Sequence, residues 1–240
     1  MGRPAGPDLT SLSRGQWAIM ITGPSREVLG RCAWALARAN DPAPFWLDVR
    51  EAGGKADPGS PPALGWLNAD QLYTVAPTQV RPPSAVGPQV LAQVIRSDEP
   101  DSAVAELSEF LRLPSPVQEM IGLHPSGAGR PAFVIANGDR VRSYWPEDPQ
   151  GVRPILDALL RQGVLPIFTA TPPAGPGRMA FDLVFDLRGA RPGDWRSGVL
   201  FCEKAPPDST FHTGEATPLG KIPEFVAALE GRPVVGSNPG

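Results

Sequence analysis

The N-terminal part of the chain predicts a strand followed by a helix. The apolar run "QWAIMIT" (16–22) lies between Gly15 and Gly23, which is typical of a short buried strand. After Ser25, apolar residues recur every three or four positions, at Val28, Leu29, Cys32, Leu36 and Ala39, which predicts an amphipathic helix. A strand, a short glycine-containing connection and a helix form the layout of a phosphate-binding loop, so this connection is the first candidate site.

The rest of the chain continues the alternation of strands and helices. Further strands are predicted over 44–49, 71–76, 131–137, 164–170 and 179–187, and helices over 102–113, 115–123, 151–163 and 222–231. Residues 197–205 and 210–219 form a predicted hairpin, and 51–65 is rich in turn residues. We therefore expect an α/β fold with a mainly parallel sheet flanked by helices and an antiparallel hairpin at one edge near the C-terminus. The expected organisation is a flexible lead-in over 1–14, one domain over 15–231 and a flexible tail over 232–240.

Composition narrows the functional classes only slightly. The 240 residues include 41% hydrophobic positions and 31 prolines, which fits a packed domain with many rigid connections. A formal net charge of −3 does not favour a nucleic-acid partner, so any such contact would need a local basic patch. The sequence has no apolar run of 18 residues, and its first residues lack the apolar segment of a signal peptide. We expect a cytoplasmic protein that does not enter the membrane.

Thiol, histidine and serine chemistry finds little support. Cys32 and Cys202 each lie in an apolar stretch, which predicts buried thiols, and no C-x-x-C motif is present. His124 and His212, together with these two cysteines, fit no usual zinc-ligand spacing. The sequence also lacks the G-x-S-x-G elbow of α/β hydrolases. We expect no metal site.

The order of these segments resembles a known family. An apolar strand with a loop at the phosphate-binding position is followed by "LGWLNADQLYTV", then by "AFVIAN" at mid-chain and "GVLPIFTAT". "FDLVFDLRG" then precedes "GVLFCEKAPPDSTFHTGEATPLGKIPEF". Over roughly residues 15–230 this is similar to a RecA-type ATPase domain of the KaiC-like branch. The resemblance implies a nucleotide site at the first loop and assembly with neighbouring domains.

The phosphate-binding loop itself departs from the family pattern. Members bind nucleotide through G-x-x-x-x-G-K-[ST], in which lysine contacts the outer phosphates and the hydroxyl helps to hold Mg²⁺. Counting from Gly23 places Val28, Leu29 and Gly30 at the last three positions. Aligning Gly30 with the second glycine instead places Ser25 at the first glycine, Arg31 at the lysine and Cys32 at the hydroxyl. Neither alignment restores the motif.

The short connection also disfavours phosphate binding on physical grounds. A helix that begins near Ser25 reduces the loop to "GPS", and Pro24 removes one backbone N–H that would face an anion. Arg26 and Arg31 are the cations nearest to this loop, but a guanidinium lacks the compact ammonium of lysine. Gly23, Ser25, Arg26, Gly30 and Arg31 are thus retained as a vestigial, weak nucleotide site.

The acidic position of the resembled family is also altered. In such enzymes the mid-chain strand ends in an acid that orients the water shell of Mg²⁺, whereas "FVIAN" ends in Asn137 and the nearest acid is Asp139. Asp48 or Glu51 stands where the family has the base that polarises water, although both also fit ordinary surface charge. Loss of the lysine, the hydroxyl and the acid together argues against hydrolysis.

Two loops are candidates for partner contact. In RecA-like proteins the loops after the corresponding strands face the centre of a ring or filament; here they are 138–151 and 172–179. They contain cations and stacking side chains, namely Arg140, Arg142, Tyr144, Trp145 and Arg178. Asp139, Glu147 and Asp148 offset the positive charge. These loops therefore fit a protein partner as well as a nucleic acid.

The sequence favours a non-catalytic RecA-like domain that serves as an interaction or regulatory module, with no cofactor. Its expected partner is another copy of itself or a RecA-like ATPase. Two alternatives remain open at this stage. One is a divergent ATPase that binds ATP and Mg²⁺ through Arg26 or Arg31, and the other is a repair or recombination accessory that binds single-stranded DNA through residues 138–151.

Overall fold

The computed structural model describes residues 9–41, 44–48, 66–68, 130–137, 153, 156–157, 159–172 and 176–232. Several predicted segments lie outside these residues: the turn-rich connection 51–65, the strand 71–76, and the helices 102–113 and 115–123. The tail from residue 233 onward lies outside them as well.

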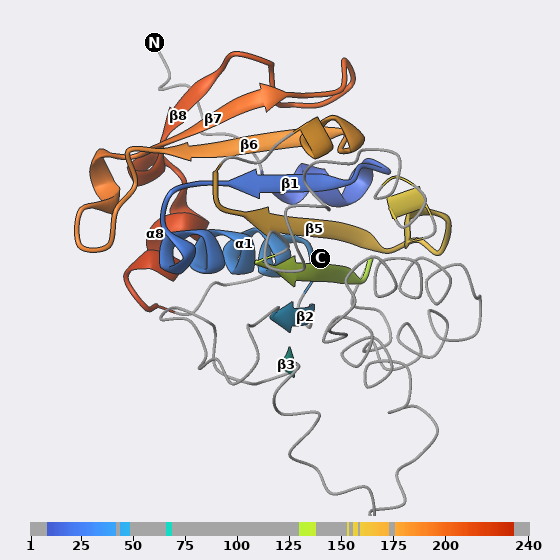
Figure 1. Cartoon of the computed structure of the whole chain (residues 1–240), viewed down its shortest axis with the longest axis horizontal. Coiled ribbons are helices and arrows are strands. Elements are labelled where there is room, and N and C mark those ends of the chain that lie inside the picture. The colour runs from blue at the N-terminus through green and yellow to red at the C-terminus, as the bar shows by residue number, and fades with distance from the viewer. Residues whose placement is uncertain are drawn as a thin grey trace, which may run out of the picture.

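The described strands form one mixed sheet (Figure 1). They are β1 (Ile19–Thr22), β2 (Phe45–Asp48), β3 (Trp66–Asn68), β4 (Ala132–Ala136), β5 (Leu165–Ala170), β6 (Leu183–Arg188), β7 (Val199–Lys204) and β8 (Ala216–Pro218). Their order across the sheet is β3-β2-β4-β5-β1-β6-β7-β8. All pairs from β3 to β6 are parallel, whereas β7 runs antiparallel to both β6 and β8. The predicted α/β class with a mainly parallel sheet and an antiparallel edge hairpin is confirmed.

The central strands are apolar because both faces of the sheet are covered there. Every residue of β1, β4 and β5 is buried, as expected for parallel strands between two layers. Alternate residues such as Val134 and Ile167 join a core with α1 on one face. On the other face, the rings of Phe168 and Phe181 meet edge to face with centroids 5.2 Å apart.

Helix α1 (Arg26–Asn40) is the long described helix and covers one face of the sheet (Figure 1). It contacts β4, β5 and the C-terminal helix α8 (Pro223–Leu229). It ends at Asn40, just before Asp41 and Pro42, since a residue before proline disfavours helical backbone. The side chain of Asp41 then accepts a hydrogen bond from the backbone N–H of Ala132 at 2.8 Å, which fixes the helix end beside β4.

The structure differs from the expected lead-in at its second half. Leu9–Arg14 form a 3-10 helix, η1, instead of a flexible segment. Leu9 and Leu12 are buried in the same core as α1, and Asn40 donates a hydrogen bond to the carbonyl of Leu9 at 3.0 Å. These two leucines are three residues apart, one turn of a 3-10 helix, so both face the core. Because the residues between and after them are polar, the sequence of this segment shows no apolar run. Residues 1–8 are outside the described part.

The strand predicted over 179–187 begins later than expected. Pro176–Ala180 form a 3-10 helix, η4, and β6 starts at Leu183. The segment turns at η4 because Phe181 packs inward against Phe168 and the side chain of Asp182 accepts a hydrogen bond from Ala18 N–H at 2.8 Å. The second segment of the predicted hairpin, 210–219, is a strand only over Ala216–Pro218, and β3 at Trp66–Asn68 was not predicted. The other predicted elements agree with the structure to within a few residues where it describes them, and residues 153, 156–157 and 159–161 of the predicted helix 151–163 are helical. In the part of the chain that is described, no helix combines the length and apolar character needed to cross a membrane.

Candidate functional site

The connection between β1 and α1 is only Gly23, Pro24 and Ser25. Ser25 is the N-cap residue of α1, and its hydroxyl accepts a hydrogen bond from Val28 N–H at 3.4 Å. Its carbonyl accepts the first helical bond, from Leu29 N–H at 2.9 Å. The prediction that the helix starts at once and shortens the loop to "GPS" is confirmed. A loop of this length cannot wrap a chain of phosphates with successive backbone N–H groups.

Apolar side chains fill the space beside this connection. Val28 and Leu29 are 3% and 1% exposed, so they point into the core as the periodicity predicted. A Cβ placed on Gly23 would lie 3.0 Å from Cβ of Leu187 and 3.4 Å from Cδ2 of Leu29. The absence of a side chain at Gly23 therefore allows β1, β6 and α1 to approach one another closely. Gly30 is buried in α1 as well, away from the connection.

Arg26, the first residue of α1, joins the ends of two neighbouring strands. Its Nη1 donates to Oδ1 of Asn137 at 2.9 Å, just after β4, and its Nη2 donates to Oγ1 of Thr171 at 3.1 Å, just after β5. This is the carboxyl edge of the parallel strands, where ligands of open α/β sheets bind. A cation that belongs to the chain itself thus occupies the edge of the sheet next to the shortened loop.

Asn137 is held in an unusual backbone conformation. Its φ is 59°, in the left-handed region that asparagine tolerates better than most other residues. The residue is buried, and its backbone N–H donates to Oγ1 of Thr169 at 2.9 Å. The backbone and the side chain of Asn137 are therefore both engaged with neighbouring residues at the position where the resembled family has an acid.

The second candidate cation, Arg31, contacts a different element. Its guanidinium pairs with Glu27 at 3.2 Å, and its Nη1 donates to the carbonyls of Ala228 and Leu229 at 3.5 and 3.4 Å. A positive charge at the C-terminal end of α8 is favourable because the carbonyls there carry partial negative charge. The structure thus joins Arg26 with Asn137 at the sheet edge and places Arg31 against α8.

A polar pair at this edge could not be found from the sequence. Thr22, the last residue of β1, donates from its hydroxyl to Oδ1 of Asp186 on β6 at 3.1 Å. Arg188 donates from Nε to Oδ2 of the same carboxylate at 2.9 Å. Thr22 and Asp186 are paired in register across the sheet although they are 164 positions apart in the chain. No local motif marks such a pair, because strand register creates it.

Most of the remaining candidate residues lie outside the part of the chain that the structure describes. They are Asp139, Arg140, Arg142, Tyr144, Trp145, His124 and Glu51. Asp48 is the last residue of β2. These predictions therefore stay predictions.

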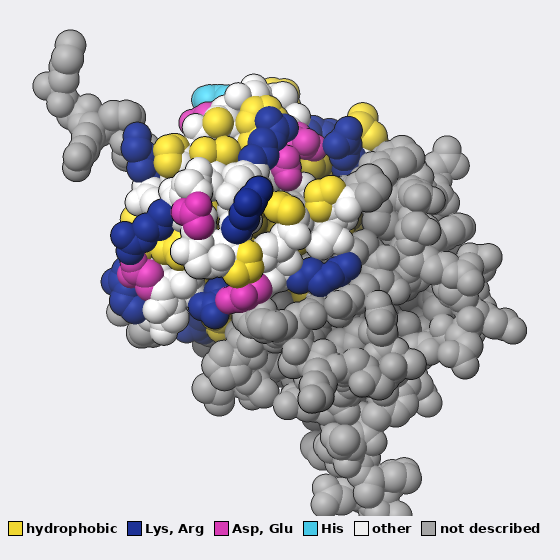
Figure 2. All heavy atoms as spheres, turned by 60° about the vertical axis from the view of Figure 1, so that its left-hand side comes forward, with side chains coloured by type: hydrophobic (Ala, Val, Ile, Leu, Met, Phe, Trp, Pro, Cys, Tyr) yellow, Lys and Arg dark blue, Asp and Glu magenta, His cyan; other side chains and the backbone are white. Residues whose placement is uncertain are grey.

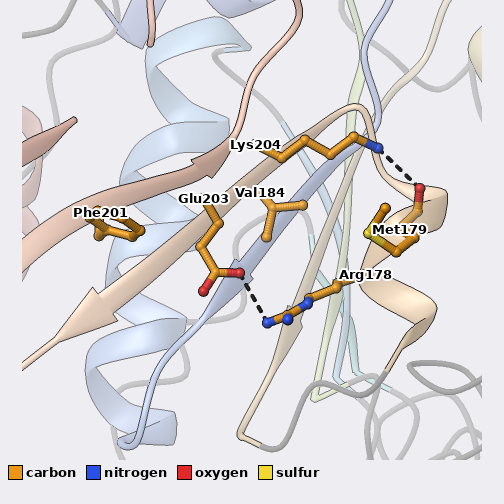
Figure 3. A pocket seen from close by; sticks show the side chains of 6 residues that line it. All are labelled: Arg178, Met179, Val184, Phe201, Glu203 and Lys204. Atoms are coloured by element: carbon orange, nitrogen blue, oxygen red, sulfur yellow. Dashed lines mark hydrogen bonds and ion pairs between the residues drawn. The ribbon is translucent and has the colours of Figure 1, made fainter. Parts of the chain in front are cut away.

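Arg178 is described, and it pairs with Glu203 at 3.2 Å. Around this ion pair the surface has a hollow of about 310 Å³ (Figure 3), which is lined by Arg178, Met179, Val184, Phe201, Glu203 and Lys204. The first two residues come from η4, Val184 comes from β6, and the last three come from β7.

The thiols and the histidine of the described part show no arrangement for catalysis. Cys32 and Cys202 are both buried and free. Burial raises the pKa of both thiols, that of Cys202 to about 11. His212 is exposed, and within the described ranges no three His, Cys, Asp or Glu side chains gather in a way that could hold a metal ion.

Charges on the described surface are mixed in sign. Figure 2 turns toward the viewer the side of the molecule to which the parallel strands point in Figure 1, and both acidic and basic side chains lie on this face. A surface of this kind does not concentrate a field of one sign, which a polyanion would need. The chain matches no family model and no curated protein sequence.

Proposed function

We propose that this protein is a non-catalytic RecA-like domain that acts as a protein-interaction or regulatory module and does not hydrolyse ATP. One observation carries the proposal. The connection after β1 has three residues, Leu29 and Leu187 fill the space beside it, and Arg26 bridges the ends of β4 and β5. Each of these features takes a place that a nucleotide or its Mg²⁺ needs.

The arrangement of the sheet supports the RecA-like assignment. The strand before the three-residue loop, β1, lies between β5 and β6. Strands β2 to β5 lie on one side of β1, and the chain then crosses to the other side, where β6, β7 and β8 lie. Such a switch in strand order places a ligand crevice at the carboxyl edge. The mid-chain strand β4 ends at the same edge, and the hairpin of β7 and β8 extends the sheet antiparallel, as the resemblance implies.

The energetic balance favours an empty site. The N-terminus of α1 retains some attraction for anions, worth about 0.3–1 kcal/mol per favourable charge. Micromolar affinity requires about 8 kcal/mol. A nucleotide at this edge would also have to displace the hydrogen bonds from Arg26 to Asn137 and Thr171. The remaining features are too weak for binding at that level.

The interaction role follows from the way in which RecA-like domains assemble. Such domains place the nucleotide between neighbours, so a member that has lost the nucleotide site keeps a docking surface. The partner is another copy of this chain or an active RecA-like ATPase, and we place the protein in the cytoplasm. The presence of both acidic and basic side chains on the face shown in Figure 2 supports a protein partner over a nucleic acid.

Calorimetric titration with ATP and Mg²⁺, combined with a phosphate-release assay, tests the proposal. We expect neither heat of binding at micromolar ATP nor turnover. Micromolar binding with turnover would overturn it in favour of a divergent ATPase. In that case the variants R26A and R31A identify the cation: loss of binding in R26A alone would place the phosphate at the edge of β4 and β5, whereas loss in R31A alone would place it toward α8.

A further inference from the structure

The hollow beside η4 has an apolar floor built on two neighbouring strands. The ring of Phe201 lies on β7, and the guanidinium carbon of Arg188 lies 3.4 Å from its centroid, which fixes the ring by a cation–π contact. Val184 from β6 forms another part of the lining. Both strands belong to the sheet, so the floor is formed before any partner arrives (Figure 3).

An exposed methionine stands at the rim of this hollow. Met179 is 63% exposed, and within the described residues it is the one large hydrophobic side chain that is exposed. Its backbone is held in place, because Nζ of Lys204 donates to the carbonyls of Met179 at 3.0 Å and of Phe181 at 2.5 Å. The side chain is therefore presented to solvent from an anchored turn, and little backbone order has to be gained on binding.

The same rim carries both signs of charge. Arg178 and Glu203 pair at 3.2 Å, and the pair is half-exposed on the arginine side. Arg188 lies 3.6 Å from the other oxygen of Glu203. A protruding apolar group, a hollow that accepts one, and a positive and a negative group thus share a single patch.

A patch that contains both members of each complementary pair fits a copy of itself. In a two-fold interface the same surface is used by both subunits, so every protrusion needs a hollow and every cation an anion within that one surface. The thioether of methionine is adaptable and makes favourable contacts with aromatic rings, which suits the ring of Phe201. We propose that this face docks a second copy of the chain, with Met179 of each copy in the hollow of the other and the Arg178–Glu203 ion pair of each copy beside that of the other about the two-fold axis.

This inference names a partner for the module proposed above, and it rests on that proposal only for the expectation that the domain docks on protein. The two are tested separately. ATP binding would reject the non-catalytic role without affecting self-association, and a monomer would reject the dimer without affecting the non-catalytic role.

Sedimentation velocity of the full chain over a concentration series up to about 200 μM provides the test. We expect a monomer–dimer equilibrium in the unchanged protein and a dimer dissociation constant raised at least about 30-fold in M179E. S197E is the matched control, since Ser197 is exposed and precedes β7, at the opposite end of that strand from Glu203 and Lys204. This control is expected to dimerise like the unchanged protein. M179A is the second variant should M179E fail to fold, and it is expected to weaken the dimer in the same direction.

Exchanging the charges tests whether the Arg178–Glu203 pair contributes to the interface. R178E places two carboxylates together in each half of the interface and is expected to weaken the dimer about tenfold or more. The double variant R178E/E203R restores opposite charges and is expected to recover the dimer. A chain that stays monomeric over the whole series, or M179E and M179A variants that dimerise as tightly as S197E, would overturn the proposal.

Discussion

Arg26 donates a hydrogen bond from Nη1 to Oδ1 of Asn137 at 2.9 Å and so joins the start of α1 to the end of β4. The two residues are 111 positions apart in the chain. The contact ties the first helix to the mid-chain strand at the carboxyl edge of the sheet, beside the shortened loop. The polar side chains at this edge of the sheet thus bind one another.

Substitution of Arg26 by alanine is expected to lower the free energy of unfolding by about 1–2 kcal/mol. Hydrogen bonds to a charged donor contribute about 1.5–3 kcal/mol when they are buried, and this contact is only partly buried. R26K retains the charge but loses the planar fork that reaches Asn137 and Thr171 together, so it should recover less than half of the loss. Urea denaturation measures the effect. R161A, at an exposed arginine, is the control and should leave stability within about 0.5 kcal/mol.

Asn137 should respond to substitution through both its backbone and its side chain. N137A loses the acceptor of Arg26 and keeps a Cβ at a φ of 59° without the polar side chain that lets asparagine adopt this conformation, and a Cβ there costs about 1–2 kcal/mol for the backbone alone. N137G loses the same acceptor but adopts this φ freely. We therefore expect N137G to be about 1 kcal/mol more stable than N137A in urea denaturation. Equal stability of the two variants would show that the backbone at this position carries no strain.

The sequence pattern predicted the fold where each element has its own periodicity. β1, β4 and β5 are continuous apolar runs, and α1 has a clear N-cap at Ser25, so their positions follow from local residues. The start of β6 was misplaced because apolar residues also occur at the end of η4 and just after it, where Phe181 packs inward against Phe168. A pattern of neighbouring residues does not show that the chain turns here, because the turn depends on the contact of Phe181 with Phe168 on another strand.

The candidate site was predictable only in part for the same reason. The three-residue connection after β1 follows from residues 23–32, since the apolar positions of a helix that starts at Arg26 cannot also bind an anion. The contacts of Arg26 with Asn137 and of Thr22 with Asp186 depend on the strand order, which brings β4, β5 and β6 beside β1. Arg31 has the same charge as Arg26 and lies on the same helix, yet it contacts α8.

Alkaline pH should reveal the buried thiol of Cys202. Burial is the main cause that raises its pKa to about 11, and the negative charge of Glu215 adds to this. The folded protein therefore keeps this proton at a pH at which the unfolded chain loses it. The stabilising contribution is complete below the ordinary thiol pKa of 9.0 and is lost as the pH rises toward 11.

Replacing Cys202 should therefore flatten the alkaline fall in stability. The slope of unfolding free energy against pH between about 9 and 10.5 should be shallower in C202A, by at most about 1.4 kcal/mol per pH unit. L200A shortens a buried neighbour on the same strand without removing a titratable group and should keep the slope of the unchanged protein. Parallel slopes in C202A and the unchanged protein would mean that the thiol titrates alike in the folded and unfolded states.

Gly23 should tolerate no side chain, because β6 and α1 approach it closely. A methyl group there would lie 3.0 Å from Cβ of Leu187, and a contact this short on a strand relaxes only by moving backbone. G23A is expected to destabilise the protein by about 1–3 kcal/mol. Gly220 is the matched control, since a Cβ at that position meets nothing within 4 Å. G220A should be neutral or slightly stabilising, because it reduces the freedom of the unfolded chain.

Introducing a lysine at the position given by the resembled motif should not produce nucleotide binding. Counted from Gly23, the lysine of the resembled motif falls on Leu29, which is 1% exposed and packs beside Gly23 and Leu187. L29K places an ammonium in this apolar contact, so we expect a loss of several kcal/mol in unfolding free energy and no increase in melting temperature when ATP and Mg²⁺ are added. L29M has a similar volume without the charge and should cost less than about 1.5 kcal/mol. If ATP and Mg²⁺ instead raise the melting temperature of L29K but not that of L29M, room for a phosphate group still exists beside Gly23, and the inference that Leu29 and Leu187 fill this space is wrong.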